Sequence, residues 1–266
     1  MNRRTFWTFA AGLAAALLLL AGCGQKSGAP AGDRLSQIKE RGELVVAMEG
    51  TWSPWTYHDE GDNLVGYDTE VAAAIAKKLG VSVRYVEGEF DGLLAGLEAG
   101  RYDIMVNGMD IDEERQEKFD FTDPYAYGHV AVIVRGDNAA IQTMEDLAGK
   151  HTANTITSTY AKIAEQYGAE VTGVDDLNQT FELLFSDRID ATLNAEDSYY
   201  DYMKAHPEAD AKIACLAPDA TLIAIPVPKG ETALVEAVNA ALAELREEGV
   251  LTELSMKYFD RDISQQ

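Results

Sequence analysis

Beyond residue 32, short apolar runs alternate with apolar positions at helical spacing, which predicts an α/β protein. Runs at residues 44–48, 104–106, 131–134 and 191–193 have the length of buried strands, and residues 81–85 alternate as in a half-buried strand. Apolar side chains three or four positions apart predict helices around residues 71–79, 93–97, 160–167, 177–185 and 234–245, and a last helix through Tyr258. This rhythm argues against a helical bundle and a β-sandwich.

Residues 1–22 have the layout of an export signal. Two arginines precede an apolar run from Phe6 to Ala21 that ends in small residues. The run is shorter than the ~20 residues that span a bilayer, which favours a cleaved signal over the alternative of a transmembrane anchor. The tetrapeptide Leu-Ala-Gly-Cys at residues 20–23 resembles the bacterial lipobox, which implies a lipoprotein with diacylglycerol and palmitate on Cys23.

Residues 23–32 are rich in Gly, Ser, Ala and Pro, so we expect a flexible tether between the lipid and the folded part. The expected location is therefore outside the cytoplasm, with the chain anchored to the cell membrane through Cys23. Of the two cysteines, Cys215 would then be the only free thiol, and its apolar neighbours predict a buried side chain.

Charge excludes one large class of partners. The chain has 22 Lys and Arg against 45 Asp and Glu, a formal net charge of −23, and would repel nucleic acid and anionic headgroups. Its 47% hydrophobic residues predict a folded chain rather than an acidic disordered one.

No pattern of catalytic or metal-ligating residues stands out. The four histidines are scattered, and neither a nucleophile elbow nor a phosphate loop is present. We therefore expect no metal, no cofactor and no enzymatic activity.

Four segments carry a family resemblance. They are EGTWSPW at residues 49–55, GYDTEV at 66–71, FDGLL at 90–94, and GMDIDEER at 108–115 running into FDFTDPY at 119–125. Together with the C-terminal residues they resemble the family 3 extracellular solute-binding proteins, the amino-acid receptors of bacterial ABC importers, over residues 35–260. The loop at 49–55 and the stretch DATLN at 190–194 look most like the cystine and polar amino-acid members.

The resemblance implies a fold of two α/β lobes, the type II periplasmic-binding-protein fold, with two hinge strands and a ligand cleft between the lobes. Mapped onto this sequence, residues 33–125 plus 228–266 form the first lobe and residues 126–227 the second. It also implies a monomer whose partners are a small amino-acid ligand and an ABC transporter permease.

The same resemblance assigns roles in the cleft. Arg115 would donate two parallel hydrogen bonds to the ligand carboxylate, a task that suits a planar guanidinium. Ser158 and Thr159 would contact that carboxylate from a helix N-terminus. The alternative for Arg115 is a surface arginine that pairs with nearby glutamates. Further pocket residues expected from the resemblance are Trp52 and Phe90 as aromatic walls, Glu49 as an acid that selects the ligand side chain, Gly108, and Met109. For Phe90, Trp55 and Tyr57, packing in the core remains an equal alternative.

The sequence also departs from the family. Ala195 stands where the family usually has an aspartate for the ligand ammonium, and Asp110 and Asp112 replace hydroxyl residues of the arginine motif. We expect Asp110 to pair with the ammonium because a buried ligand charge needs a partner, with Asn194 as a neutral contact. The alternatives are that Asp110 only caps the following turn, or that Glu196 or Asp197 enters the cleft.

These observations favour a lipid-anchored receptor that captures a polar amino acid and passes it to an ABC importer. The acids Glu49, Asp110 and Asp112 near a single arginine would suit a ligand with an extra positive group, or a modified amino acid. Two other functions remain open: a prephenate or arogenate dehydratase on the same fold, with Asp110 or Glu196 as the acid, and a sensory binding protein that presents its ligand to a membrane receptor.

Overall fold

The computed structural model describes residues 33–265. The expected signal peptide, the tether and Cys23 lie outside the described residues. Within residues 33–265, no helix has both the length and the apolar character needed to cross a bilayer.

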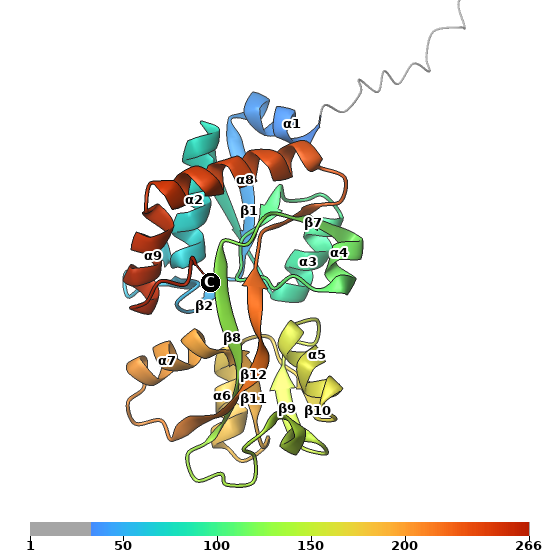
Figure 1. Ribbon diagram of the computed structural model, residues 1–266, viewed down its shortest axis with the longest axis vertical. Helices are drawn as coiled ribbons and strands as arrows, with labels where there is room; N and C mark the ends of the chain where they lie inside the picture. Colours follow the sequence, from blue (N-terminus) through green and yellow to red (C-terminus); the bar gives the residue numbers. More distant parts are fainter. Residues whose placement is uncertain (1–32, 266) are drawn as a thin grey trace, which may run out of the picture. The chain divides into compact units, whose positions relative to one another are not determined.

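A parallel sheet lies at the centre of the first lobe (Figure 1). Strand β1 pairs in parallel with β5 on one side and β6 on the other, and its residues are buried almost throughout. Such a strand needs apolar side chains on both faces, which is why the run at residues 44–48 lacks alternation. The bounds are β1 (Glu43–Met48), β5 (Ser82–Glu87) and β6 (Ile104–Met105).

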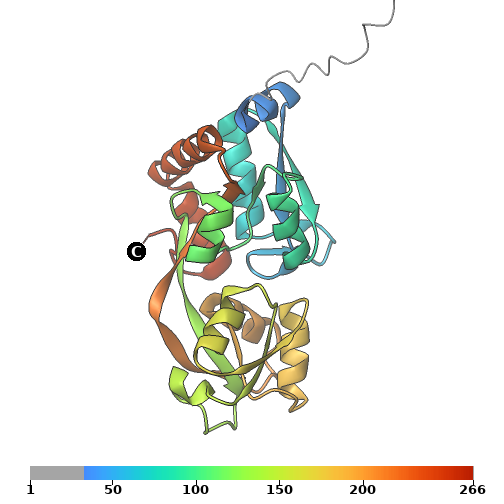
Figure 2. The same cartoon turned by 90° about the vertical axis from the view of Figure 1, so that its right-hand side faces the viewer.

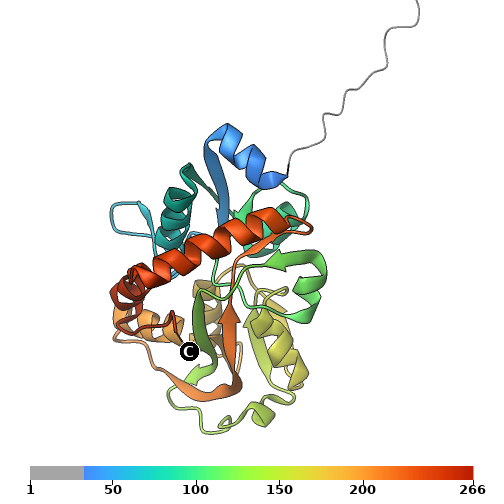
Figure 3. The same cartoon turned by 45° about the horizontal axis from the view of Figure 1, so that its top comes forward.

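Helices cover both faces of this sheet. The long helix α8 packs against α1, α2 and α9 on one side, and α3 packs against β1 and β6 (Figures 1 and 3). Helix α2 ends at Gly80, whose φ of 71° is the left-handed conformation that favours glycine. The bounds are α1 (Arg34–Arg41), α2 (Tyr67–Leu79), α3 (Phe90–Glu98), α8 (Thr232–Glu247) and α9 (Val250–Phe259).

Shorter elements complete the first lobe. Strands β2, β3 and β4 form an antiparallel sheet, and β7 pairs with β13. The bounds are β2 (Thr51–Trp52), β3 (Thr56–His58), β4 (Leu64–Val65), α4 (Glu113–Lys118), β7 (Phe119–Phe121) and β13 (Pro226–Pro228).

The second lobe has its own strands and helices. Strands β9 and β10 are parallel, and β11 lies antiparallel to the long strand β8. Helix α7 has no counterpart among the elements expected from the sequence, because its apolar face is narrow and tyrosine-rich. The bounds are η1 (Met144–Leu147), β9 (His151–Asn154), α5 (Thr159–Gln166), β10 (Glu170–Gly173), α6 (Leu177–Phe185), β11 (Thr192–Ala195) and α7 (Glu196–Ala205).

Two long antiparallel strands, β8 (Ala126–Arg135) and β12 (Ala211–Ile223), run from one lobe into the other (Figures 1 and 2). The prediction of a two-lobed α/β fold with two hinge strands is therefore confirmed. The residue boundaries expected for the lobes stay a prediction. The strand expected at 131–134 is longer than its apolar run, and Cys215 on β12 is half-buried rather than buried.

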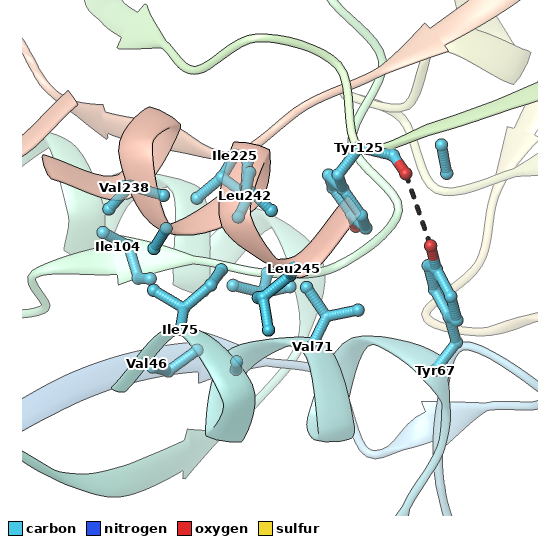
Figure 4. Close-up of a cluster of buried hydrophobic side chains, with 14 of the residues drawn as sticks. Val46, Tyr67, Val71, Ile75, Ile104, Tyr125, Ile225, Val238, Leu242 and Leu245 are labelled. Carbon is cyan, nitrogen blue, oxygen red and sulfur yellow. Dashed lines mark hydrogen bonds between the residues drawn. The ribbon is translucent and has the colours of Figure 1, made fainter. Parts of the chain in front are cut away.

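The core of the first lobe fixes where the hinge begins. Figure 4 shows apolar side chains of α2, α8 and the central sheet packed together, with Tyr67 donating a hydrogen bond to the backbone oxygen of Tyr125. The hydroxyl of Tyr125 in turn donates to the buried carboxylate of Asp68 at 2.6 Å. Burial raises the pKa of Asp68 to about 7. The residue that precedes β8 is thus held by α2.

Replacement of Ile75 by alanine tests this packing. Ile75 is completely buried between α2 and its neighbours, so Ile75→Ala should lower the free energy of unfolding by about 2–5 kcal/mol. Met256, which is 49% exposed on α9, provides the control: Met256→Ala should change it by less than about 0.5 kcal/mol. Urea denaturation followed by circular dichroism measures both, and equal effects would contradict the assigned core.

Candidate ligand-binding site

A cavity of about 600 Å³, counted as the space between atoms and partly open to solvent, lies between residues of the two lobes. All ten residues expected in the ligand pocket line it: Glu49, Trp52, Phe90, Gly108, Met109, Asp110, Arg115, Ser158, Thr159 and Asn194. Their role in binding stays a prediction.

The ends of parallel strands explain why these distant segments meet. Glu49 follows β1 and Asn107 follows β6, and both strands run in the same direction. Side chains after the carboxyl ends of parallel strands gather at one edge of a sheet. In the second lobe, Asn154 ends β9 and contributes to the same cavity.

Arg115 is buried, not a surface residue, and it joins the two lobes. Its Nη1 donates to the backbone oxygen of Asp110 at 3.0 Å and to the hydroxyl of Thr159 at 2.9 Å. Its Nη2 donates to the backbone oxygen of Thr157 at 3.1 Å, and the guanidinium lies 5.6 Å from the centre of the Phe90 ring. A ligand carboxylate would therefore share this arginine with protein acceptors from both lobes.

The structure separates the roles of the two aspartates in the arginine motif. Asp112 caps α4, because its Oδ1 accepts from the backbone N–H of Arg115 at 2.7 Å. Asp110 does not cap the turn, which rules out that alternative. Instead it lies buried in the cavity wall, where burial raises its pKa to about 6 against the opposing effects of Arg115 and a hydrogen bond from Thr159.

Helix α5 begins at the cavity as expected. Ser158 is its N-cap and accepts from the backbone N–H of Ala161 at 3.1 Å, and Thr159 is its first residue. The free N–H groups of a first turn and the helix dipole both favour an anion. This end of the cavity therefore suits a carboxylate.

Aromatic rings form part of the wall. Trp52 lines the cavity and stacks on Trp55 with ring centres 5.5 Å apart, whereas Trp55 packs in the core against Phe259. Gly108 has a φ of 52°, and a Cβ there would lie 2.7 Å from the Trp52 ring. Glycine thus permits the ring to lie against the backbone. Of the residues with open assignments, Phe90 lines the cavity and Trp55 and Tyr57 do not.

Glu49 and Asn107 form a reciprocal pair of hydrogen bonds. The backbone N–H of Glu49 donates to Asn107 Oδ1 at 2.8 Å, and Asn107 Nδ2 donates to Glu49 Oε2 at 2.6 Å. Burial raises the pKa of Glu49 to about 7, and the charge of Asp176 adds to the increase. This carboxyl therefore holds its proton to a higher pH than an exposed glutamate does.

Glu196 and Asp197 do not enter the cavity. Asp197 is buried and accepts two hydrogen bonds from the guanidinium of Arg261, at 2.9 and 2.8 Å, and Glu196 lies 3.5 Å from the same group. Of the three acids considered for the ligand ammonium, only Asp110 lines the cavity. Asn194 lines the cavity too, with its Oδ1 accepting from the N–H of Ala195 at 2.9 Å.

The sequence reasoning missed eight lining residues. They are Thr51, Asn107, Asn154, Thr155, Tyr160, Asp176, Leu177 and Thr180. Two signals could have found some of them: Asn107 follows a buried strand and Asn154 ends one, and Asp176 precedes a helix as its N-cap. Within residues 33–265, no three His, Cys, Asp or Glu side chains are grouped so that they could hold a metal ion.

The buried acids predict how stability depends on pH. Because the pKa values of Glu49 and Asp110 are raised, the folded state retains protons that the unfolded state has lost, and stability falls as pH rises from about 4.5 to 7. Glu49→Gln keeps the acceptor for Asn107 and should reduce this fall by about 1–3 kcal/mol. Melting temperatures between pH 5 and pH 8 measure it.

The control for this prediction is Glu60→Gln, which changes an exposed glutamate outside the cavity. It should leave the pH dependence unchanged. A Glu49→Gln protein with the same slope as the original would show that Glu49 is already ionised at pH 5.

The comparison with known proteins agrees with this geometry. The model of the bacterial extracellular solute-binding proteins, family 3, matches residues 44–261. A probable amino-acid ABC transporter-binding protein of Haemophilus influenzae is 37% identical over 235 residues, which cover 88% of this chain and 91% of that protein. The L-cystine-binding protein TcyA of Bacillus subtilis is 36% identical over 252 residues, which cover 92% of this chain and 94% of that one.

A solved structure also resembles the chain. An ancestral arginine-binding protein bound to arginine has 36% sequence identity and a TM-score of 0.77, over 82% of this chain and 99% of that one. The match of the family model to most of the chain, the related binding proteins and the shared two-lobed fold give one answer: the chain belongs to family 3 of the bacterial extracellular solute-binding proteins.

Proposed function

We propose that this protein is a lipid-anchored receptor outside the cytoplasm that binds a polar amino acid and delivers it to an ABC importer. The observation that carries the proposal is the set of charges around one small cavity. Arg115 and the first turn of α5 supply donors for a carboxylate, and the buried carboxyl of Asp110 supplies an acceptor for an ammonium group.

Two buried polar atoms support a polar ligand. Trp52 Nε1 and Asn154 Oδ1 belong to residues that line the cavity, and neither has a hydrogen-bond partner among the described residues. Nearly all buried polar groups in proteins are hydrogen-bonded. One is a donor and the other an acceptor, so a ligand with both kinds of group would satisfy them.

The acids favour a ligand with more than one positive group. Glu49, Asp110 and Asp176 line the cavity with Arg115 as the single basic residue among them. Cystine has two ammonium groups, and a cationic amino acid has an ammonium and a charged side chain. The similarity to an L-cystine-binding protein supports cystine as the first candidate, and the similarity to an arginine-bound ancestral protein supports arginine as the second.

A thermal-shift screen tests the proposed function. The purified protein would be melted with each amino acid, cystine and small peptides, since a ligand that binds only the folded state raises the melting temperature. Calorimetry in two buffers would then count protons: a cation beside Glu49 should release protons on binding. If no amino acid raises the melting temperature, the proposal is contradicted.

Arg115→Ala should weaken binding of the ligand found in this screen by about 3–5 kcal/mol, because a buried carboxylate would lose its charged partner. Isothermal titration calorimetry measures the loss, and a melting curve of the unliganded variant checks that it folds. Glu113→Ala, on the exposed face of α4, is the control and should bind normally. Affinity of Arg115→Ala within tenfold of the original would end the assignment.

An enzymatic role has one feature in its favour, the buried carboxyl of Asp110 in the cavity wall, whose pKa burial raises to about 6. Prephenate and arogenate in the same screen separate the two functions. Formation of product would establish a dehydratase, whereas binding of an amino acid without turnover supports the receptor. Loss of growth on that amino acid when a neighbouring permease is deleted would favour import over sensing.

The lipid anchor has its own test. Cys23→Ser should move the protein from the membrane fraction to the soluble fraction because no thiol remains to receive lipid, and ligand affinity should be unchanged. Cell fractionation followed by immunoblotting measures the distribution. Cys215→Ser is the matched control, since Cys215 lies on β12 of the folded lobes. A Cys23→Ser protein that stays in the membrane would refute lipidation at this residue.

A further inference from the structure

Outside the cavity, one lysine of the second lobe contacts two acids of the first. Lys162 Nζ on α5 lies 3.1 Å from Asp112 Oδ2 and 2.7 Å from Glu114 Oε2, both at the start of α4. Figure 1 shows α4 and α5 on the same side, across the junction of the lobes. Neither Lys162 nor these acids line the candidate ligand cavity.

Asp112 has two functions that one side-chain oxygen could not perform. Its Oδ1 caps α4 through the N–H of Arg115, and its Oδ2 faces Lys162 and also lies 3.5 Å from Arg115 Nε. A threonine, the residue type that the family resemblance leads us to expect here, could cap the helix with its hydroxyl. It would have no second oxygen and no charge for Lys162.

Burial and charge make this contact more than an incidental surface pair. The side chain of Asp112 is 22% exposed and that of Lys162 is 30% exposed, so water screens this pair only in part, whereas Glu114 is 57% exposed and its contact with Lys162 is screened more strongly. Lys162 and Lys118 together lower the pKa of Glu114 to about 2. Glu114 therefore remains charged throughout the physiological range, and one lysine meets two carboxylates.

We propose that Lys162, Asp112 and Glu114 form an electrostatic latch that holds the two lobes closed from outside the ligand cavity. The latch forms only when α5 reaches α4, so it stabilises the closed state whatever ligand is bound. It slows ligand release and leaves capture by the open state unchanged. Affinity is thus partly set by residues that never touch the ligand.

The first test compares variants of the latch with matched controls. Lys162→Met removes the charge, and Asp112→Thr keeps the helix cap but loses the second oxygen. Lys118→Met is the control, because Lys118 pairs with Glu114 at 3.0 Å within the same helix. The probes are L-cystine and L-arginine. Lys162→Met and Asp112→Thr should raise the dissociation rate about three- to tenfold and leave the association rate unchanged. Lys118→Met should change neither rate.

Two additional variants check the physical cause. Lys162→Arg should retain the slow release of the original protein, because a guanidinium can also bridge two carboxylates. In an Asp112→Thr, Glu114→Gln background, Lys162→Met should have no further effect. The difference between Lys162→Met and the original should also shrink in high salt. Equal dissociation rates for Lys162→Met and the original would overturn the latch.

The second test needs no ligand. It is required because the first test, which measures ligand dissociation, rests on the proposed function. Dyes on cysteines introduced at the exposed positions Glu40 and Glu182, with Cys23 and Cys215 replaced by serine, report the separation of the lobes by energy transfer. Lys162→Met and Asp112→Thr should populate the open state more than the original does. If the distribution of lobe separations is the same in the variants as in the original, the latch is overturned. If the distribution shifts towards the open state but neither L-cystine nor L-arginine binds, only the proposed ligands are contradicted.

Discussion

The buried guanidinium of Arg115 is the interaction on which the site depends. A charge removed from water must be paired or hydrogen-bonded, and this one donates to a backbone oxygen of the first lobe and to two oxygens of the second. Its two partners in the second lobe lie more than 40 residues away along the chain. The same side chain thus positions the start of α5, the cavity wall and the contact between the lobes.

Around this arginine, the fold puts polar groups where secondary structure ends. Strands β1 and β6 run in parallel and deliver Glu49 and Asn107 to one edge, while α5 begins at the cavity with Ser158 as its cap. Unpaired backbone donors and short polar side chains are concentrated at such termini. A cavity lined by them has donors for an anionic group at one end and carboxyl acceptors in its wall.

Local patterns predicted much of the fold, and the family resemblance predicted many of the cavity residues. Apolar runs located β1 and β6, helical spacing located α2 and α8, and the resemblance of the motif around Arg115 to family 3 located the wall that contains Gly108 and Asp110. These features depend on neighbours in the sequence. The half-buried state of Cys215 and the helix α7 were not predictable in this way, because both depend on which distant strand lies alongside.

Tertiary contacts likewise decided the residues whose assignments were open. Trp52 and Trp55 are three positions apart and equally apolar, yet only Trp52 lines the cavity. Trp55 instead packs against Phe259 of the last helix. Asp197 is held by Arg261, 64 residues away, and is therefore withdrawn from the site. No local pattern contains either partner, so sequence reasoning could name the candidates but not choose between them.

The reciprocal hydrogen bonds of Glu49 and Asn107 have a consequence for how such receptors change their ligand during evolution. Asn107 uses both ends of its amide on Glu49, one on the backbone and one on the side chain. A residue at position 49 without a side-chain acceptor would leave the Asn107 Nδ2 group buried and unmatched, which is costly. Redesign of the pocket for another substrate must therefore treat positions 49 and 107 as one unit and exchange them together.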